Sequence, residues 1–197
     1  MSTSAKLIIG IAGTLSSGKD TLAEYLEHQK GFVHKSTSDM LRAEKKRIYG
    51  DSPEALLKRA DPFANNLRSE RGAGILVQLA YEESLVANAK CIVISGIRSI
   101  GEVEKLHEIG GRLLFVDADP DIRFKRAQSR KRDIQDIKSF EDFLAQEATE
   151  SDNIDQTDKT VQNLPAMKRL ADYVMHNNYD LVTFLAEADQ CIFSDQP

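Results

Sequence analysis

The sequence of 197 residues is short of cysteines, long hydrophobic runs and net positive charge. No apolar run approaches the ~20 residues that a membrane-spanning helix needs, so we expect no membrane partner. The segment 1–5 is too short and too polar to be a signal peptide. The two cysteines, Cys91 and Cys191, predict buried thiols in a reducing cytosol rather than a disulfide framework. We therefore expect a cytoplasmic protein.

The formal net charge of −5 argues against a general nucleic-acid-binding protein, although a local basic patch can still bind a phosphate. Hydrophobic residues make up 41% of the chain and charged residues 29%, which is the composition of a globular domain rather than a disordered chain. This length suffices for one well-buried domain with small inserts.

Short apolar runs alternate along the chain with segments of helical character. We expect strands over 6–13, 32–35, 91–95, 112–117 and 173–176. We expect helices over 19–29, 38–49, 54–68 with a break at 61–62, 75–87, 99–109, 121–129, 139–150, 166–170 and 181–188. The very polar segment 151–160 predicts a mobile loop. The alternation predicts an α/β fold, with a doubly wound five-stranded parallel sheet covered on both faces.

One glycine-rich stretch joins the first expected strand to the first expected helix. It reads Gly13-Thr14-Leu15-Ser16-Ser17-Gly18-Lys19-Asp20-Thr21. Its glycines let the backbone curl so that N–H groups point at a phosphate, and the helix N-terminus adds partial positive charge. Lys19 supplies a charge for the outer phosphates of a nucleoside triphosphate. Strand, turn and helix form the context of a P-loop, so we expect ATP to bind at Gly13, Ser16, Ser17, Gly18, Lys19, Asp20 and Thr21.

Asp20 follows the lysine at the place where P-loops usually carry the Ser or Thr that contacts Mg²⁺, and Thr21 comes one position later. Two interpretations of Asp20 stand. Its carboxylate can hold the metal through water, or it can cap the helix that begins here. We therefore place Asp20 and Thr21 among the candidate contacts of a magnesium ion.

Arginines follow two of the expected strands. Arg42 comes just after the second strand and Arg98 just after the third. A phosphoryl-transfer enzyme must hold a second phosphate, and the planar guanidinium binds phosphate oxygens bidentately. Because α/β folds bind ligands at the carboxyl ends of strands, both arginines are candidates for that site, with a solvated surface role as the alternative. Arg68 and Arg71 are further candidates, and a surface role at a helix end is their alternative.

These segments resemble adenylate kinases and their relatives. Gly-Lys-x-Thr at 18–21 is similar to the adenylate kinase P-loop, and Gly-Lys-Asp-Thr resembles that of phage deoxynucleoside monophosphate kinases. Ser-Thr-x-Asp-Met-Leu-Arg at 36–42 resembles the segment that holds the acceptor nucleotide, and 93–98 resembles the one that brings a second arginine. The resemblance covers 6 to about 185. It looks closest to a group of archaeal and bacterial P-loop kinase-like proteins, often named by analogy with adenylate kinase or dephospho-coenzyme A kinase.

By this resemblance, Thr37 approaches the base or sugar of the acceptor, and Arg42 and Arg98 bind its phosphate. Asp39 lies near the metal and its waters. Thr37 and Asp39 can alternatively cap the helix that they begin. Many relatives end the third strand with Asp, where this chain has Ser95, which carries no charge. Either Asp20 or Asp39 then supplies the carboxylate, or metal binding rests mainly on the phosphates.

A basic run follows the fourth expected strand. It contains Arg123, Lys125, Arg126, Arg130, Lys131 and Arg132. Kinases of this superfamily carry an arginine-bearing lid after that strand, and the resemblance implies a lid with Arg126, Arg130 and Arg132. A closed lid excludes water and adds positive charge at the transferring phosphate. The alternative is a basic, solvated helix face. The implied catalytic set is Lys19, Arg98, Arg126 and Arg130.

The resemblance implies one P-loop kinase domain over 1–197, with small lid and acceptor-binding inserts. Its core is expected over 6–36, 88–122 and 165–197, the acceptor-binding insert over about 37–87 and the lid over about 123–160. It implies transfer of the γ-phosphoryl group from Mg²⁺-ATP to a nucleoside monophosphate, by a monomer or homodimer that binds no nucleic acid. Dephospho-coenzyme A or another small metabolite is the alternative acceptor. A nucleotide-dependent switch without an acceptor is the alternative from another class.

Overall fold

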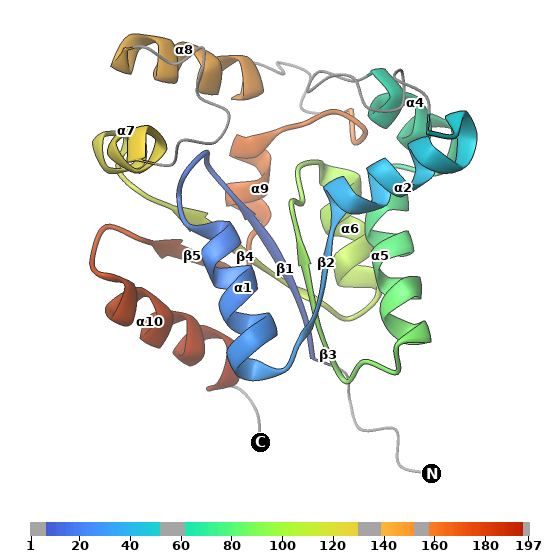
Figure 1. Ribbon diagram of the computed structural model, residues 1–197, viewed down its shortest axis with the longest axis horizontal. Helices are drawn as coiled ribbons and strands as arrows, with labels where there is room; N and C mark the ends of the chain where they lie inside the picture. The colour runs from blue at the N-terminus through green and yellow to red at the C-terminus, as the bar shows by residue number, and fades with distance from the viewer. Residues whose placement is uncertain (1–6, 52–61, 130–138, 152–157, 195–197) are drawn as a thin grey trace.

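The computed structural model describes residues 7–51, 62–129, 139–151 and 158–194 (Figure 1). Its centre is a sheet of five parallel strands: β1 (Leu7–Gly13), β2 (Val33–Ser36), β3 (Cys91–Ser95), β4 (Arg112–Asp117) and β5 (Tyr173–His176). The order across the sheet is β2-β3-β1-β4-β5, so β1 is central and lies between β3 and β4. The doubly wound parallel sheet predicted from the sequence is confirmed.

Helices cover both faces of the sheet, and others lie beyond its carboxyl end (Figure 1). One face carries α1 (Lys19–Lys30) and α10 (Leu181–Phe193). The other face carries α5 (Ile75–Val86), α6 (Ile100–Glu108) and α9 (Leu164–Leu170). Beyond the carboxyl ends of the strands lie α2 (Thr37–Tyr49), α4 (Pro62–Arg71), α7 (Pro120–Ser129) and α8 (Phe140–Ser151).

The strands are apolar on both sides because each side faces a different layer of helices. In β1, Ile8 and Ala12 belong to the core cluster shared with α5 and α6. Ile9 and Ile11 belong to the cluster shared with α1 and α10. Since successive side chains of a strand alternate between the faces, one continuous apolar run supplies two cores.

Three segments differ from expectation. The last helix runs to Phe193 rather than 188, because Ile192 continues its buried face. Of the loop expected over 151–160, Ser151 ends α8 and 152–157 lie outside the described residues. Residues 158–163 lie against the start of α6 through an isolated bridge between Ser99 and Gln162. Of the helix expected over 54–68, only the part from Pro62 onward is described, and it continues as far as Arg71.

Candidate functional site

The turn between β1 and α1 has a backbone that side chains would obstruct. A Cβ on Gly13 would lie 2.2 Å from the carbonyl oxygen of Val116, and one on Gly18 would lie 2.3 Å from Asn177 Nδ2. Gly18 has φ +103° and caps α1 without a side-chain hydrogen bond. The first N–H groups of α1 are thereby available to an anion at the helix N-terminus. The turn therefore has the geometry of a phosphate-binding loop.

The side chains of this P-loop lie at different depths. Ser17 is fully buried, whereas Ser16 is partly exposed and adopts a positive φ of 59°. Lys19 Nζ donates to the carbonyl oxygen of Thr14 at 3.4 Å, so the lysine folds back across the loop. Asp20 is exposed in the first turn of α1, where its negative charge interacts favourably with the positive end of the helix dipole. Because the cap of α1 is Gly18, Asp20 does not cap the helix.

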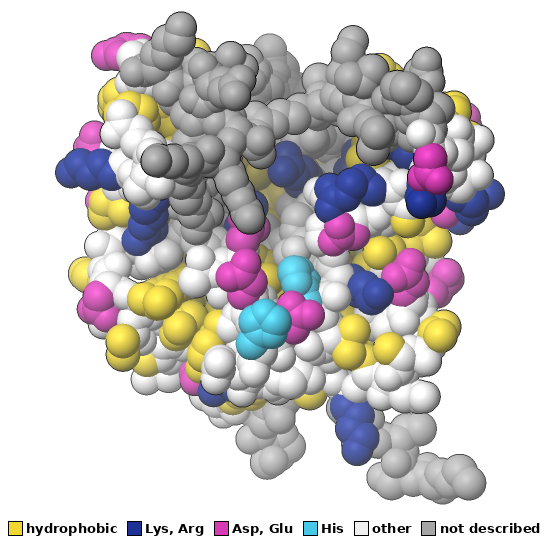
Figure 2. Space-filling model, viewed as in Figure 1, with side chains coloured by type: hydrophobic (Ala, Val, Ile, Leu, Met, Phe, Trp, Pro, Cys, Tyr) yellow, Lys and Arg dark blue, Asp and Glu magenta, His cyan; other side chains and the backbone are white. Residues whose placement is uncertain are grey.

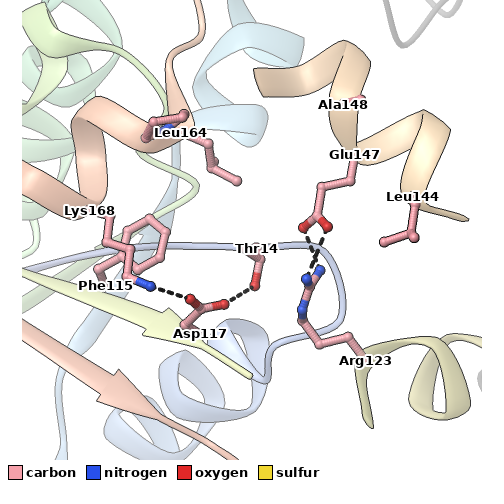
Figure 3. Close-up of a pocket in the computed structure, with 10 residues that line it drawn as sticks. Thr14, Phe115, Asp117, Arg123, Leu144, Glu147, Ala148, Leu164 and Lys168 are labelled. Atoms are coloured by element: carbon pink, nitrogen blue, oxygen red, sulfur yellow. Dashed lines mark hydrogen bonds and ion pairs between the residues drawn. The ribbon is translucent and has the colours of Figure 1, made fainter. Parts of the chain in front are cut away.

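Asp117, at the carboxyl end of β4, supports the start of the P-loop. Its carboxylate accepts hydrogen bonds from Thr14 Oγ1 at 3.0 Å and from Lys168 Nζ at 2.7 Å (Figure 3). Burial alone raises the pKa of this carboxyl, but the bonds from Lys168, Thr14 and the amide of Ala118, together with the lysine charge, outweigh it. The pKa of Asp117 therefore lies below its ordinary value, and the carboxylate is charged at neutral pH.

Asn177 contacts the P-loop from the end of β5. Its side chain is buried, and its Nδ2 donates to the carbonyl oxygen of Ser17 at 2.8 Å. Its Oδ1 accepts a bond from Arg126 Nη2 at 3.2 Å. The amide thus joins the P-loop to α7, the helix that carries the first expected lid arginine. Arg130 and Arg132 lie outside the described residues.

On the other side of β1, the turn after β3 leans back toward the P-loop strand. The amides of Gly96 and Ile97 both donate to the carbonyl oxygen of Ile11, at 3.1 and 3.3 Å. This places the following residue, Arg98, in the turn after β3, beside the carboxyl end of the P-loop strand. Arg98 is partly exposed, and its Nη1 donates to Gln162 Oε1 at 3.3 Å.

The start of α2 lies beside this turn. Thr37 is buried, and its hydroxyl donates to the carbonyl oxygen of Gly96 at 2.7 Å. Ser36 caps α2 by accepting from the amide of Ser38. Asp39 and Arg42 are exposed one turn apart and form an ion pair with each other. The structure therefore brings Thr37 to the Arg98 turn and leaves the two charged residues facing solvent.

Ser95, which replaces the aspartate of many relatives, is paired with a histidine. Its hydroxyl lies 2.8 Å from His34 Nε2, and His34 Nδ1 lies 3.5 Å from Glu27 Oε2. The serine is buried at the end of β3. Its hydroxyl is thus held by a neighbouring strand, at the place where the resemblance expects a charge.

Two further candidate arginines are held in ion pairs. Arg68 is buried and binds Glu102 of α6, while Arg71 binds Glu44 of α2 at 2.8 Å. Hydrogen bonding by Arg47 and the charge of Arg71 outweigh the effect of burial and hold the pKa of Glu44 below its usual value. In Figure 2, Lys and Arg side chains are visible in the upper half of the view, where Figure 1 places the carboxyl ends of the strands and α2.

A cavity of about 470 Å³ opens beside the P-loop, between β4 and the helices α7, α8 and α9 (Figure 3). Two ion pairs border it, Asp117 with Lys168 and Arg123 with Glu147. Arg123, part of the basic run, is buried and also donates to the carbonyl oxygen of Ala118 at 2.7 Å. The cavity is lined by Thr14, Phe115, Asp117, Arg123, Leu144, Glu147, Ala148, Leu164, Pro165 and Lys168.

Several supporting residues were missed by the sequence interpretation. Asp117, Lys168, Glu102 and Asn177 are not among the candidate residues of the sequence interpretation. The one available signal was position, since Asp117 and Asn177 stand at the carboxyl ends of strands, where α/β folds bind ligands. Lys168 and Glu102 lie inside helices and carry no comparable signal.

The described residues contain no group of three or more His, Cys, Asp or Glu side chains placed to hold a metal ion. Within the same ranges, none of the helices combines the length and the apolar character that crossing a membrane requires.

Comparison with solved structures shows the same fold. TT1252 from Thermus thermophilus matches with a TM-score of 0.63 at 20% identity, covering 98% of this chain and all (100%) of that one. Shikimate kinase from Acinetobacter baumannii, in complex with shikimate, matches with a TM-score of 0.55 at 15% identity, covering 97% of this chain and 95% of that one. The fold is therefore that of P-loop kinases.

Sequence comparison shows the family. A UPF0200 protein of Pyrobaculum aerophilum is 34% identical over 145 residues, which are 73% of this chain and 76% of the relative. A protein of Acanthamoeba polyphaga mimivirus named "Putative deoxynucleotide monophosphate kinase" is 24% identical over 82% of this chain and 99% of its own length. The AAA domain family matches residues 9–148. With the P-loop and the five-stranded sheet on the same residues, this chain belongs to the AAA domain family and is a P-loop kinase-like relative of the UPF0200 proteins.

Proposed function

We propose that this protein is an ATP-dependent phosphotransferase that moves the γ-phosphoryl group of ATP to a nucleoside monophosphate. The observation that carries the proposal is the position of Arg98. It follows β3, next to the P-loop strand, and its turn bonds back to Ile11 of that strand. A site with a P-loop and a neighbouring arginine has one group for each of the two phosphates that a phosphoryl transfer must align.

The P-loop residues fit the donor nucleotide. The N-terminus of α1 has a glycine cap without a side-chain hydrogen bond. Together with the glycine turn, it offers backbone N–H groups to the phosphates of ATP. Lys19 exchanges its long bond to Thr14 for the outer phosphates. Asp20 and Thr21 in the first turn of α1, together with Asp39, would hold Mg²⁺, through water. The ion, when bound, neutralises charge on the phosphate oxygens, and such sites take only one or two carboxylates from the protein.

The acceptor side is built from α2 and the Arg98 turn. Arg98 and Arg42 bind the acceptor phosphate, and Thr37 contributes to the acceptor site at the join between the two. The pair of Arg42 with Asp39 is exposed, and exposed ion pairs are weak. An incoming phosphate therefore displaces the carboxylate at little cost and binds the guanidinium bidentately.

The lid side begins at α7. Arg126 lies close to the P-loop through Asn177, so it can add positive charge where the phosphoryl group moves. We assign Arg130 and Arg132 to the same lid from the sequence. Closure over ATP excludes water and so favours transfer to the acceptor over hydrolysis. The name of the mimivirus relative supports a nucleoside monophosphate as acceptor.

The test is incubation with Mg²⁺-ATP and a panel of ribo- and deoxynucleoside monophosphates plus dephospho-coenzyme A, with chromatographic separation of products. One new nucleoside diphosphate is the expected result. If coenzyme A is formed instead, dephospho-coenzyme A is the acceptor, and the proposal of a nucleoside monophosphate is wrong. Equal, slow ADP formation with every acceptor, and without one, contradicts the proposal and favours a nucleotide-dependent switch.

A further inference from the structure

A buried ion pair lies directly behind Arg98. Glu102 of α6 is completely buried, and Arg68 of α4 is 4% exposed. Glu102 Oε1 accepts from Arg68 Nε at 3.1 Å and from Nη2 at 2.8 Å. Burying two charges is costly unless both are well hydrogen-bonded, and here the guanidinium fork and the carboxylate satisfy each other. A buried ion pair alone is weak evidence that it stabilises the fold. The other hydrogen bonds of Glu102 indicate a further role.

The second oxygen of the same carboxylate holds the backbone of Arg98. Glu102 Oε2 accepts from the amide of Arg98 at 2.8 Å and from the amide of Ser99 at 3.2 Å. The hydroxyl of Ser99 accepts in return from the amide of Glu102, which completes a capping box at the start of α6. The carboxylate of Glu102 therefore connects α4 to the amides of Arg98 and Ser99. These two amides lie on either side of the Cα atom that carries the Arg98 side chain.

Arg98 is also held by residues 162–163, just before α9. Its carbonyl oxygen accepts from the amide of Asn163 at 2.9 Å, and its guanidinium donates to Gln162. Ser99 and Gln162 form a β-bridge. Arg98 is thus fixed between α4, through the ion pair, and the segment just before α9.

We propose that Glu102 and Arg68 are positioning residues for Arg98. The pair fixes the backbone at Arg98 so that its guanidinium is already oriented toward the acceptor phosphate. It also couples α4 to that orientation, so that a shift of the helix reaches the arginine through one carboxylate. This inference rests on the proposed function, in which Arg98 binds the acceptor. Preorganisation of this kind removes the ordering cost from each binding event and keeps the reacting groups aligned.

The test compares the double variant R68M/E102M with the wild type, because a methionine cannot accept hydrogen bonds from the amides of Arg98 and Ser99 as a glutamine would. Removing both charges together avoids a buried, unpaired charge and keeps the side-chain volumes similar. We expect a folded protein in which the KM for the acceptor rises about 10-fold to 100-fold while the KM for ATP stays the same. Amide exchange measured by NMR should accelerate at Arg98 and Ser99. Because Glu108 forms an exposed pair on the same helix, E108Q is the matched control and should behave as wild type.

A role in stability alone predicts a different pattern, in which the melting temperature falls while the acceptor KM and the local exchange stay as in the wild type. That pattern overturns the inference. If R68M/E102M does not fold, R68K is measured, because it keeps a positive charge beside Glu102 and removes only the guanidinium fork. The same direction of change is expected in exchange and in acceptor KM. If the wild type phosphorylates no acceptor, the proposed function fails. The positioning role is then decided by exchange, and unchanged exchange at Arg98 and Ser99 overturns it.

Discussion

The two strands beside β1 support the site in different ways. On the β4 side, Asp117 and the neighbouring Asn177 bond directly to the P-loop, at Thr14 and Ser17. On the β3 side, Glu102 bonds to the backbone that presents Arg98. In the proposed function, the β4 side therefore shapes the loop for the donor phosphates, whereas the β3 side orients a side chain toward the acceptor. Changes on the first side should affect ATP, and changes on the second should affect the acceptor.

The largest effect is expected from Lys19→Ala, because the lysine belongs to the P-loop between the two sides. Losing its charge at the transferring group should reduce kcat by about 100-fold to 1000-fold. Lys168→Ala serves as the comparison, since Lys168 reaches the loop only through Asp117 and Thr14. Steady-state kinetics with saturating acceptor measure both. Equal losses in the two variants would contradict the assignment of Lys19 to the phosphates.

Gly18→Ala should weaken the binding of ATP at the P-loop. The new Cβ would lie 2.3 Å from Asn177 Nδ2 at a φ of +103°, so both the loop and its supporting amide must move. We expect ATP affinity, measured by calorimetry, to fall at least about tenfold, since strain in this region costs about 1–2 kcal/mol. Gly31→Ala is the matched control, because Gly31 has a φ of +73° with nothing within 4 Å of its Cβ position. It should lower stability slightly and leave ATP affinity intact.

Arg98→Ala should weaken the binding of the acceptor. Loss of a charge-assisted contact of about 1.5–3 kcal/mol should raise the acceptor KM roughly 10-fold to 100-fold, with the KM for ATP unchanged. Arg42→Ala should have the smaller effect, because Arg42 is exposed and must first leave Asp39. Initial rates at varied acceptor concentration measure both variants. A rise in the KM for ATP alone would reverse the roles of the two sides.

The smallest effect is expected from Asp117→Asn. The folded-state pKa of Asp117 lies below its ordinary value of 3.8, so its stabilising contribution is full above that value. It is lost as the pH falls through the lower folded-state pKa. We expect the variant to melt about 2–4 °C below the wild type at pH 7, with the difference closing below about pH 4. A difference that stays constant across this range would show that the charge of Asp117 contributes nothing.

The sequence predicted what depends on local pattern. The apolar runs predicted all five strands, and the glycine spacing predicted the P-loop with Lys19 at the start of α1. Arg42 and Arg98 could be found because they follow strands, and Asp39 was implied by the resemblance to adenylate kinases. Their roles toward an acceptor or a metal remain predictions.

The supporting contacts could not be predicted, because they join residues far apart in the chain. Asn177 and Ser17 are 160 positions apart, and Glu102 and Arg68 are 34 apart. From the sequence, Arg68 was a candidate for the acceptor site or a surface residue at a helix end, and Arg123 was part of the basic run. Only the three-dimensional structure, in which an ion pair joins α4 to α6 and α7 packs on α8, shows that both are buried with a carboxylate partner.

The bond from Asn177 to the P-loop has a consequence for biosynthesis. The loop leaves the ribosome before its supporting amide, which lies 160 positions later in the chain. A nascent chain can form the turn at 13–19 and still lack β5, which brings Asn177 to Gly18 and Ser17. We expect ribosome-bound chains stalled before β5 to bind ATP weakly, and the ability to bind it to be acquired only once β5 and Asn177 have been added.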